Sequence, residues 1–535
     1  MREPEAADGA GTVPPVHSHD SRPYDWVGNW SEKRAALSPD RVALVDDTTG
    51  REFTYADLDA RANRTARLLR AHGVGDGERV AVVSRNRPAL VDLFFACGKT
   101  GGVLAPLSHR LAARELGELL ADVAPALVVV EAPFAEGVRE ALSQVDAEPT
   151  VLGLPSEDER TDHPSLLDER PADDSPVQTA DLGMDDPALF LHTGGSTGVP
   201  KETVLTHGSL LWNCFNTITA WGLREDDVTP MVFPMFHTGG WNVLTLPLFH
   251  MGAKVVIARE FDPGEVLSLV ERTGSTVLVA VPAVLRMMTE HEDWDETDLS
   301  TLRFAKSGGG PCRDAVLRRW WDRGVDLSQG YGLTECGPNN FTMPDGWPRE
   351  KADSVGVPGI HVDARAVDDD GEEVPRGDVG ELELASPHAA ERYWNNEHET
   401  QATFGPREGE SEGWVSTGDL VRVDEDGYYY IEGRKKNMFV SGGENVYPAA
   451  VENVLTDHPD IEEAVVVGVP DETWGEVGKA VVVGDESLTL EDLETFLDGR
   501  LARFKQPKAL AFVAEMPTSG PSKIDREAVK ARFGE

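Results

Sequence analysis

The 535-residue chain has no window of about 20 uninterrupted apolar residues, the length that a membrane-spanning helix requires. Residues 1–20 are acidic and contain proline, glycine and histidine, and they lack the basic-then-apolar order of a signal peptide. These absences argue against stable membrane insertion. They predict a cytoplasmic protein whose residues 1–24 form a disordered tail.

Cysteine is scarce, and its spacing shows no pairing. The four cysteines are Cys97, Cys214, Cys312 and Cys336, and no two of them form a CxxC pair. Their neighbours are apolar or glycine-rich, so the pattern favours neither zinc ligation nor a disulfide framework. We expect four buried free thiols.

Positive charge is also in short supply. Lys and Arg together number 50 against 94 Asp and Glu, which gives a formal net charge of −44. Such a field repels nucleic acid, so no nucleic-acid partner is expected. The acids are spread along the chain rather than gathered in one tail, and lysine is rarer than arginine. This favours adaptation to a high-salt cytoplasm, where screening limits self-repulsion, over an acidic-partner or metal-buffer role.

Short apolar runs alternate with amphipathic helical patterns from about residue 50 to 380. The predicted strands include 79–84, 126–130, 188–191, 254–258 and 276–281. A helix is predicted over residues 55–72, with Thr54 as its N-cap and Gly73 as its stop. This alternation is typical of an α/β fold with mixed, largely parallel sheets.

The last third of the chain has a different pattern. Residues 355–383 and 413–433 contain short strands broken by turns, which predicts a β-rich subdomain. After Arg434 the pattern becomes α+β, with helices at 448–455 and 490–504 and strands at 464–469 and 480–483. We therefore predict an N-terminal domain at 25–433, a hinge at 434–436 and a small mobile C-terminal domain at 437–535.

A segment rich in glycine and hydroxyl groups, residues 193–201, follows the predicted strand 188–191. Its glycines let backbone N–H groups converge on an anion, its hydroxyls add donors, and Lys201 adds a mobile cation. This composition suits a polyphosphate, although the spacing is not that of a Walker A loop. The order Thr-Gly-Gly-Ser-Thr-Gly-x-Pro-Lys resembles the phosphate loop of the adenylate-forming superfamily, which includes acyl- and aryl-CoA synthetases, peptide-synthetase adenylation domains and beetle luciferases.

The resemblance runs from about residue 25 to 533. Within the superfamily, the chain is most similar to the fatty-acid and related acyl-CoA synthetases. Two later motifs carry this resemblance, Gln329-Gly-Tyr-Gly-Leu-Thr-Glu-Cys-Gly-Pro338 and Trp414-Val-Ser-Thr-Gly-Asp419. It implies that Tyr331 stacks on adenine, that Thr334 meets the α-phosphate and that Asp419 binds ribose. The implied ATP- or AMP-binding set is Thr193, Gly194, Gly195, Ser196, Thr197, Gly198, Lys201, Gly308, Gly309, Gly310, Tyr331, Gly332, Thr334, Asp419 and Arg434.

Two further residues, His237 and Glu335, receive roles from the resemblance. His237, in Phe233-Pro-Met-Phe-His-Thr-Gly-Gly-Trp241, matches the position beside the acyl carbonyl. The small residues 238–240 that follow it are expected to leave room for a substrate tail. Glu335 offers the hard oxygen ligand that suits Mg²⁺ on the phosphates. Read from the residues alone, His237 is a core histidine and Glu335 a surface acid.

The C-terminal motifs complete the set. Lys436 matches the hinge pivot, and residues Ser441, Gly442 and Gly443 match the segment that meets the pantetheine arm of coenzyme A. Lys523, in a terminal lysine motif, is the implied catalytic cation, alongside Lys201 and His237. Three residues depart from the family pattern: Glu202, Asn437 and Ser522.

The resemblance implies an AMP-forming acid–CoA ligase. ATP and Mg²⁺ convert a carboxylic acid, expected to be a medium- or long-chain fatty acid, to an acyl-adenylate, and coenzyme A then takes the acyl group. The alternatives are an aryl- or succinylbenzoate-type ligase, an enzyme that loads a carrier protein, and a catalytically silent nucleotide-binding protein. The chain shows no Ser-bearing carrier domain, which argues against a peptide-synthetase module. The sequence leaves the oligomeric state, monomer or homodimer, open.

Overall fold

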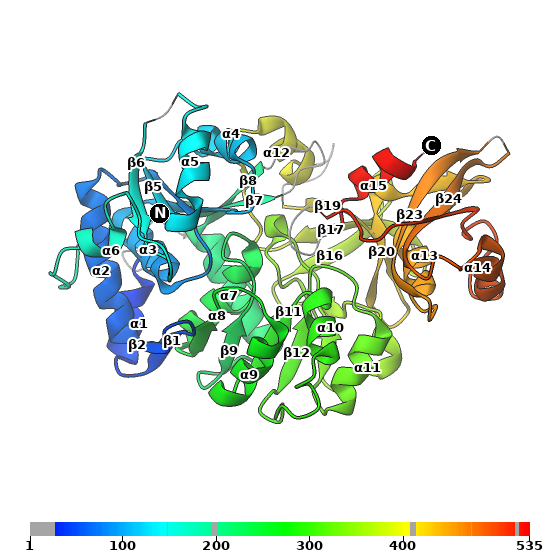
Figure 1. The fold of residues 1–535 in the computed structure, drawn as a ribbon, viewed down its shortest axis with the longest axis horizontal. Helices are drawn as coiled ribbons and strands as arrows, with labels where there is room; N and C mark the ends of the chain where they lie inside the picture. Colours follow the sequence, from blue (N-terminus) through cyan, green and yellow to red (C-terminus); the bar gives the residue numbers. More distant parts are fainter. Residues whose placement is uncertain are drawn as a thin grey trace, which may run out of the picture.

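The computed structural model describes residues 27–146, 148–193, 201–406, 413–471, 473–518 and 524–534. Along the long axis in Figure 1, the first two-thirds of the chain (blue to green) form one large body. The last hundred residues (orange to red) form a smaller body at the other end. The predicted tail 1–24, the loop residues Gly194–Gly198, and Ser522 and Lys523 lie outside the described residues.

A mixed seven-stranded sheet forms the first layer of the large body. Its order is β18-β8-β7-β4-β3-β5-β6, and only the β7–β8 and β8–β18 pairings are antiparallel. The strand bounds, in that order, are Arg392–Tyr393, Lys201–Thr206, Pro187–Thr193, Val103–Leu107, Arg79–Val83, Leu127–Glu131 and Thr150–Leu154.

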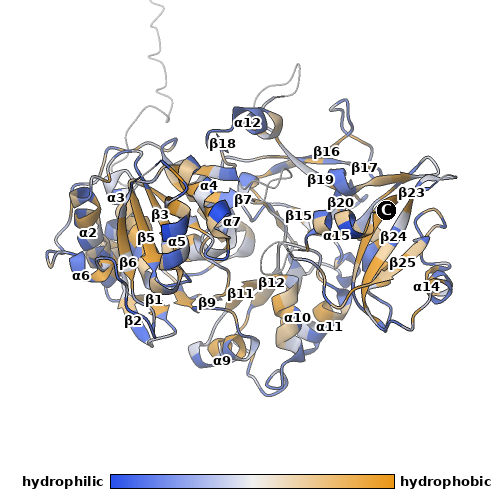
Figure 2. Cartoon of the chain, turned by 45° about the horizontal axis from the view of Figure 1, so that its top comes forward, coloured by the Kyte–Doolittle hydropathy of each residue, from blue (hydrophilic) through white to orange (hydrophobic). Residues whose placement is uncertain are grey.

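Helices cover both faces of this sheet, which explains the continuous apolar runs of its strands. In β3, Val80 and Val82 pack on the side of helices α2 (Tyr55–Ala71) and α3 (Pro88–Thr100). The alternate residues Ala81 and Val83 pack on the side of α4 (Ala113–Val123) and α5 (Ala135–Leu142). Figure 2 shows the result, with hydrophobic strands inside and hydrophilic helix surfaces outside.

Two smaller sheets extend the large body. One has the order β2-β1-β10-β9, with bounds Arg51–Thr54, Val42–Asp46, Lys254–Ile257 and Val228–Met231. The other is a parallel sheet, β11-β12-β13, with bounds Val277–Ala280, Phe304–Ser307 and Leu327–Gln329. The helices nearby are α1 (Trp30–Leu37), α7 (His207–Trp221), α8 (Thr245–Met251), α9 (Pro263–Thr273), α10 (Pro282–Glu290) and α11 (Asp314–Asp322).

The two stretches predicted to be β-rich form one antiparallel sheet. Its order is β16-β17-β19-β20, with bounds Asp363–Val367, Val379–Ala385, Val415–Val423 and Tyr429–Arg434. Beside it lie the short pair β14 (Phe341–Thr342) and β15 (Val357–Pro358), and helix α12 (Glu397–Phe404). Because β20 ends at Arg434, the antiparallel sheet stops where the hinge is predicted to begin.

The smaller body has its own five-stranded sheet and core. The strands are β21 (Phe439–Ser441), β22 (Glu444–Val446), β23 (Ile461–Asp471), β24 (Gly475–Gly484) and β25 (Ala509–Phe512). The helices α13 (Pro448–Leu455), α14 (Leu490–Leu497) and α15 (Arg526–Phe533) pack on it. Its apolar cluster is separate from those of the large body, as expected of an independent domain.

Most of the predicted elements are present, and the fold class is confirmed. Thr54 caps α2 through a capping box with Asp57. The helix predicted over 490–504 is wrong at its end, because α14 stops at Leu497 and Gly499 follows with a φ of +74°. The stretch between β6 and β7 contains the short helix α6 (Leu166–Glu169). All four cysteines are buried free thiols, as predicted.

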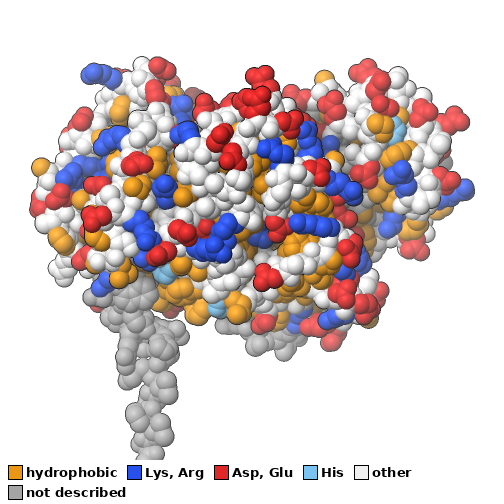
Figure 3. All heavy atoms as spheres, turned by 90° about the horizontal axis from the view of Figure 1, so that it is seen from below, with side chains coloured by type: hydrophobic (Ala, Val, Ile, Leu, Met, Phe, Trp, Pro, Cys, Tyr) orange, Lys and Arg blue, Asp and Glu red, His pale blue; other side chains and the backbone are white. Residues whose placement is uncertain are grey.

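Some acidic residues, such as Asp92 and Glu131, are buried, but many lie at the surface. On the face shown in Figure 3, acidic side chains are spread along the outline of both bodies rather than gathered in one patch. Among the helices of the described ranges, none combines the length and the apolar character needed to cross a membrane.

Candidate active site

The predicted phosphate loop connects two antiparallel strands. Thr193 ends β7 and Lys201 begins β8, and the two residues are register partners. The hairpin therefore fixes both ends of the glycine-rich segment on a buried sheet. The segment's own residues, Gly194–Gly198, are outside the described part of the chain, so their predicted contacts with phosphate remain predictions.

Lys201 meets a carboxylate and an aromatic ring at this edge. Its Nζ forms an ion pair with Glu399 of α12 and lies 5.3 Å from the centre of the Tyr393 ring. The hydrogen bond from Lys201 is the leading cause that lowers the pKa of the Glu399 carboxyl below its usual value. In this structure the ammonium is thus already paired, so contact with a phosphate requires exchange of Glu399 for the ligand.

The predicted magnesium ligand, Glu335, lies in the same neighbourhood. Glu335 is 8% exposed, and its Oε1 accepts a hydrogen bond of 2.8 Å from Tyr393 Oη. Burial, followed by the nearby Glu335 charge, raises the pKa of Tyr393 well above its usual value, so the phenol is a donor. Tyr393 therefore connects the predicted metal ligand with the predicted phosphate-binding lysine.

A single carboxylate is compatible with a magnesium ion that arrives on a nucleotide. Mg²⁺ is usually held by one or two carboxylates together with water and substrate phosphates. Within the described ranges, no group of three His, Cys, Asp or Glu residues is arranged to hold a metal ion by itself. The residues present fit a substrate-borne ion, with Glu335 as the protein ligand.

The predicted adenine loops lie at the carboxyl edge of the parallel sheet β11-β12-β13. Ser307 and Gln329 end neighbouring strands in register, so Gly308–Gly310 and Gly330–Tyr331 leave the sheet side by side. In open α/β sheets, ligands bind outside the carboxyl ends of parallel strands. Gly332 tolerates no side chain, because a Cβ there would lie 2.0 Å from the Pro338 carbonyl oxygen.

Tyr331, Asp419 and Arg434 form a hydrogen-bonded group. Tyr331 Oη donates to Asp419 Oδ2 at 2.6 Å, and Arg434 Nε lies 2.8 Å from Asp419 Oδ1. Asp419 and Arg434 are register partners on β19 and β20, which places their side chains on the same face. Burial, and then the Asp419 charge, raises the pKa of Tyr331 well above its usual value. A carboxylate has about four acceptor positions, so capacity remains for ribose hydroxyls.

Thr334 and Glu335 open the short helix Thr334–Cys336 directly after the Tyr331 turn. The Asn340 backbone N–H donates to the Tyr331 carbonyl at 3.1 Å, which closes this segment into a compact loop. The predicted contact between the Thr334 hydroxyl and the α-phosphate remains a prediction. Cys336 is fully buried and its pKa is raised by burial, which fits packing rather than nucleophilic chemistry.

His237 lies in a cluster of imidazole and phenyl rings. Its ring centre is 4.5 Å from that of Phe236 and 6.1 Å from that of His192, which comes from β7. Burial, followed by His237, lowers the pKa of His192 to about 3, so that ring is neutral. The cluster brings the predicted acid-binding loop next to the residue that precedes Thr193, as the predicted role of His237 requires.

The small residues after His237 do not provide open space, which corrects our expectation. A Cβ at Gly239 would lie 2.6 Å from Phe233 Cδ1, and one at Gly240 would lie 2.6 Å from the Pro234 carbonyl oxygen. The glycines are thus packed against the preceding turn of their own loop. Their absent side chains allow this close packing rather than a substrate tail.

The predicted hinge carries two lysines that face different bodies. Lys435 Nζ lies 2.7 Å from Asp369, in the turn that follows β16, and 3.0 Å from Glu381 of β17. Lys436 Nζ lies 3.9 Å from Glu527 of α15, in the smaller body. The change of partner between adjacent residues agrees with a boundary here, although rotation about Lys436 remains a prediction. Asn437 is the last residue of the short helix Lys435–Asn437.

The predicted pantetheine segment is a tight hairpin. Ser441 and Glu444 pair across the turn formed by Gly442 and Gly443, whose φ values are +62° and +88°. Two consecutive positive φ values are characteristic of a type I′ turn, which glycine adopts without strain. The exposed Trp474 covers Gly442, since a Cβ there would lie 2.4 Å from its ring.

The predicted catalytic lysine, Lys523, lies outside the described residues. The segment that contains it is closed at its base by a β-bridge between Thr518 and Ile524. Next to this base, Arg526 Nη1 donates to Glu452 Oε1 of α13 at 2.6 Å. The position of Lys523 itself relative to the large body remains a prediction.

Glu202, which departs from the family pattern, occupies an unusual environment. It is fully buried, and neither carboxylate oxygen has a hydrogen-bond partner among the described residues. Burial, followed by Asp122, raises its pKa to about 8. The residue next to Lys201 is therefore largely a neutral acid at neutral pH.

Four residues at the site carried no prediction from the sequence. Tyr393 and Glu399 hold Lys201 and Glu335, His192 contacts His237, and Asn339 joins segments that are distant in the chain. Asn339 Nδ2 lies 3.1 and 3.2 Å from the carbonyl oxygens of Val243 and Asn242. His192 and Asn339 directly flank motifs that were recognised, so adjacency was an available signal. Tyr393 and Glu399 do not adjoin any recognised motif, so no signal in the sequence pointed to them.

Comparison with known proteins identifies the class. The profile of the AMP-binding enzyme family matches residues 31–394, and that of the AMP-binding enzyme C-terminal domain matches residues 450–523. The chain is 38% identical over 510 residues to a feruloyl-CoA synthase from Amycolatopsis, covering 95% of this chain and 99% of that one. It is 36% identical to an indoleacetate–CoA ligase from Aromatoleum aromaticum, covering 94% and 97%.

A fatty-acid relative and a solved structure are also similar. A long-chain-fatty-acid–CoA ligase from Mycobacterium tuberculosis is 32% identical, covering 95% of this chain and 98% of that one. The crystal structure of ATP-bound MatB from Rhodopseudomonas palustris superposes with a TM-score of 0.85 at 31% identity, covering 95% and 99%. The chain therefore belongs to the AMP-binding enzyme family. Within that family it is an AMP-forming acid–CoA ligase, which uses ATP and coenzyme A.

Proposed function

We propose that the acid activated by this ligase is a compact aromatic acid whose ring carries a hydrogen-bond donor. The observation that supports this is a buried amide cluster beside the His237 loop. Asn242 Nδ2 donates to Thr238 Oγ1 at 3.0 Å, and Asn213 Nδ2 donates to the Asn242 carbonyl at 2.6 Å. Both side-chain oxygens, Asn213 Oδ1 and Asn242 Oδ1, are buried and have no partner in the described part of the chain.

Unpaired buried acceptors favour a ligand that brings a donor. A buried polar group without a hydrogen bond costs about 1–3 kcal/mol, so a phenolic O–H or an indole N–H that reaches one of these oxygens gains binding energy. An alkyl chain leaves both oxygens unpaired. The acids named in two relatives, ferulic and indoleacetic acid, are aromatic and carry such a donor.

The proposed chemistry assigns each side chain a limited task. The acid carboxylate attacks the α-phosphorus of ATP and pyrophosphate leaves; the thiol of coenzyme A then attacks the acyl-adenylate and AMP leaves. The protein supplies positioning and charge neutralisation. Asp419 and Tyr331 hold the nucleoside, Lys201 and Lys523 neutralise developing negative charge, and Glu335 binds the magnesium that the nucleotide carries.

A fatty acid is the second candidate. It is the acid implied by the family resemblance of the sequence, and the Mycobacterium tuberculosis relative named for long-chain fatty acids supports it. That relative is less similar to the chain than the two relatives named for aromatic acids, at 32% identity against 38% and 36%. The amide cluster and this difference both favour the aromatic acid.

The test is CoA-dependent AMP release across matched acids in molar KCl. We expect 4-hydroxycinnamate to exceed cinnamate in kcat/KM by tenfold or more, and both to exceed octanoate and palmitate. In Asn213→Leu the ratio between the two cinnamates should fall towards one. A clear preference for palmitate would support the fatty-acid candidate, and equal rates for the two cinnamates would contradict the proposed role of the amides.

The division of work between the domains has a separate test. We expect Lys523→Ala to abolish acid-dependent ATP–pyrophosphate exchange and to spare thioester formation from a supplied acyl-adenylate, because the second step does not need a cation at the α-phosphate. Lys530→Ala, a lysine of the last turn of α15, is the matched control. Loss of both half-reactions, or of neither, contradicts this assignment.

A further inference from the structure

A second cavity lies outside the proposed catalytic centre. It has a volume of about 260 Å³ and lies where the carboxyl ends of β1, β3, β6 and β10 come together. Carboxyl ends of parallel strands are the preferred ligand-binding edge of α/β folds. The lining residues are Asp46, Thr49, Arg51, Phe53, Arg61, Arg87, Pro88, Ala89, Leu154, Pro155, Ser156, Glu157, Leu167 and Arg259.

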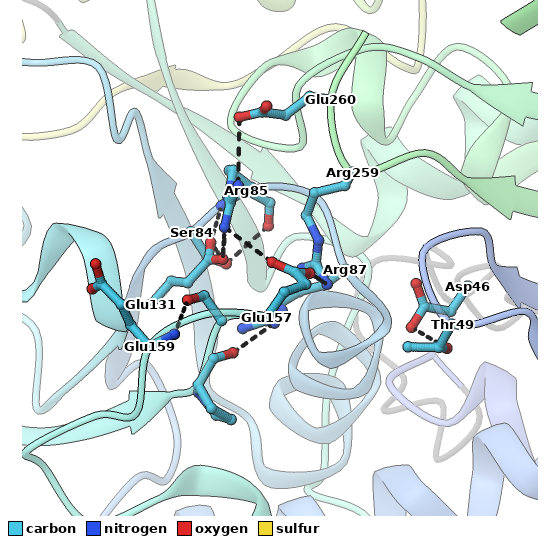
Figure 4. Close-up of polar contacts among 12 residues, drawn as sticks. Asp46, Thr49, Ser84, Arg85, Arg87, Glu131, Glu157, Glu159, Arg259 and Glu260 are labelled. Atoms are coloured by element: carbon cyan, nitrogen blue, oxygen red, sulfur yellow. Dashed lines mark hydrogen bonds and ion pairs between the residues drawn. The ribbon is translucent and has the colours of Figure 1, made fainter. Parts of the chain in front are cut away.

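Two arginines in this lining have donors that no group in the described part of the chain accepts. Arg87 is only 9% exposed, and its Nη1 is buried without a partner in the described ranges, while its Nη2 donates to the Pro155 carbonyl at 2.8 Å. The Nε and Nη1 atoms of Arg259 are likewise buried and unpartnered there. Figure 4 shows both guanidinium groups in one region, reaching it from different segments.

The acidic groups in the lining are already engaged. Glu157 lies 2.8 Å from Arg259 Nη2 and 3.4 Å from Arg85 Nη2, and Asp46 Oδ2 accepts from Thr49 Oγ1 at 2.8 Å. They leave Arg87 without a direct counter-charge. Burial, and then repulsion from Arg259, lowers the pKa of Arg87 to about 10. Arg259 is paired with Glu157 through Nη2 alone, and Arg87 has no ion-pair partner in the described ranges. In a protein with a net charge of −44, these unused buried donors are unexpected unless an anion completes the site.

The start of helix α3 adds to the positive potential. Pro88 and Ala89, its first two residues, line the cavity, and no side chain caps its N-terminus. Free N–H groups and the helix dipole favour an oxyanion at such a position, and a planar guanidinium matches phosphate oxygens.

The size of the cavity indicates an organic body as well. At about 260 Å³ it far exceeds the roughly 30 Å³ that one water molecule occupies in the liquid. Leu154, Leu167 and the ring of Phe53 supply apolar surface, and the Arg51 and Arg61 guanidinium carbons lie 5.1 and 4.4 Å from that ring centre.

We propose that this cavity is a second ligand site, which binds a phosphate monoester through Arg87, Arg259 and the N-terminus of α3. The site is connected to the acid-binding loop by one residue. Asn86, next to Arg87, accepts from the Met235 N–H at 2.8 Å and donates to the Phe233 carbonyl at 2.9 Å. Occupation of the cavity therefore stabilises the turn that holds the His237 loop.

The test titrates inorganic phosphate, as the minimal oxyanion probe, into the full-length protein. The catalytic cleft is saturated with ATP in the absence of acid, and ionic strength is held constant with KCl. We expect saturable binding by calorimetry and a rise in the thermal midpoint. Arg87→Gln and Arg259→Gln should each weaken binding tenfold or more. Arg114→Gln, which removes an arginine with an 84% exposed side chain on α4, should bind like the wild type.

Folding of the variants is checked by circular dichroism, and if Arg87→Gln does not fold, Arg259→Gln and Arg87→Lys decide the question. Absence of saturable binding by the wild type overturns the proposal. So does wild-type affinity in a folded Arg87→Gln or Arg259→Gln.

Coenzyme A and dephospho-coenzyme A distinguish two sources of the phosphate. If Arg259→Gln raises the KM only for the phosphorylated form, the ligand is the 3′-phosphate of the co-substrate. If both KM values are unchanged while phosphate binding is lost, the ligand is a separate phosphate monoester. Each result supports the site and identifies its occupant.

Discussion

Two buried carboxylates lie beside the proposed ATP site, and their surroundings differ completely. Asp419 on β19 is 6% exposed. It accepts a hydrogen bond of 2.6 Å from Tyr331 Oη, and Arg434 Nε lies 2.8 Å from its Oδ1. Glu202 on β8 is fully buried, one residue after Lys201, and neither of its oxygens has a partner among the residues that the structure describes. Asp419 forms an ion pair with Arg434 and still has acceptor positions for further hydrogen bonds. Glu202 has a pKa raised to about 8.

The contrast shows that partners, and not burial alone, decide whether a carboxyl group carries charge. Desolvation acts on both groups, because both are removed from water. Only Asp419 is compensated by a cation and a phenol, which arrive from other segments of the fold. A charged acid is thus held where a nucleoside is expected, and a mostly neutral one where a second negative charge near the phosphates would be unfavourable.

The largest effect is expected from removing the charge of the partnered carboxylate. Asp419→Asn keeps the size of the side chain, but leaves Arg434 without its ion pair and weakens two hydrogen bonds. Bonds to charged groups are worth about 1.5–3 kcal/mol each, so we expect kcat/KM for ATP to fall by about 100-fold or more. AMP release and ATP calorimetry measure this. Asp314→Asn, at a half-exposed acid on α11, is the control, and a loss below about fivefold in Asp419→Asn contradicts the prediction.

The carboxyl group of Glu202 should instead have a large effect on how the stability of the protein depends on pH. The pKa of Glu202 is about 8 in the folded protein against 4.5 in the unfolded chain, so the folded state holds the proton more tightly. Stability contributed by this proton is present below about pH 4.5 and is lost as the pH rises to 8. At about 1.4 kcal/mol per pKa unit, the difference between 4.5 and about 8 corresponds to a loss of roughly 5 kcal/mol.

Glu202→Gln should remove this slope. Thermal midpoints of the variant and the wild type should therefore separate in favour of the variant between pH 5 and pH 8.5. Glu118→Gln, a half-exposed acid on α4, should keep the slope of the wild type. A pH profile that Glu202→Gln leaves unchanged would show that the buried carboxyl group has found a partner.

The surface acids extend the comparison to charges that are solvated and repel one another. The net charge is −44, and we propose that salt screens this repulsion. The screening length falls from about 10 Å at 0.1 M to 3 Å at 1 M. We expect the thermal midpoint to rise by several degrees between 0.1 M and 1 M KCl, since 1 kcal/mol corresponds to roughly 2–4 °C in domains of about 150–250 residues and the repulsion here involves many charges. An unchanged midpoint contradicts the salt-adaptation proposal.

The smallest effect sharpens the description of the partnered site. Tyr331→Phe deletes the bond to Asp419 Oδ2 but retains the ring for stacking on adenine. A hydrogen bond to a charged group contributes about 1.5–3 kcal/mol, so the KM for ATP should rise by about tenfold or more, which is still less than in Asp419→Asn, where two such bonds are weakened. The effect should vanish in the Asp419→Asn background, and full additivity in this double-mutant cycle would show that the two groups do not act together.

The individual site residues could be predicted from the sequence because each lies in a contiguous motif. Tyr331, Glu335 and Asp419 were found in this way, and the Thr54 cap and the Gly442–Gly443 turn follow from local backbone preferences. Contacts between motifs were not predictable. Tyr331 and Asp419 are 88 positions apart, and their bond depends on where β13 ends and where β19 passes in space.

Residues without a local signal were missed for the same reason. Tyr393 reaches Glu335 because β18 pairs with β8, a pairing between segments almost 190 positions apart that no local pattern encodes. Gly239 and Gly240 were read as space for a substrate, yet they are filled by Phe233 and Pro234. A glycine in the sequence does not show whether other residues of the fold occupy the space beside it.

By itself, the sequence determined the α/β class, the order of the domains, the family and the residue types that ATP chemistry requires, because these are encoded in short-range periodicity and contiguous motifs. Only the tertiary structure decided which charges are paired. It pairs Asp419 with Arg434, leaves Glu202 without a partner among the described residues, and gathers Arg87 and Arg259 around one cavity. Electrostatic energy depends on distance and burial in space, and neither can be read from position along the chain.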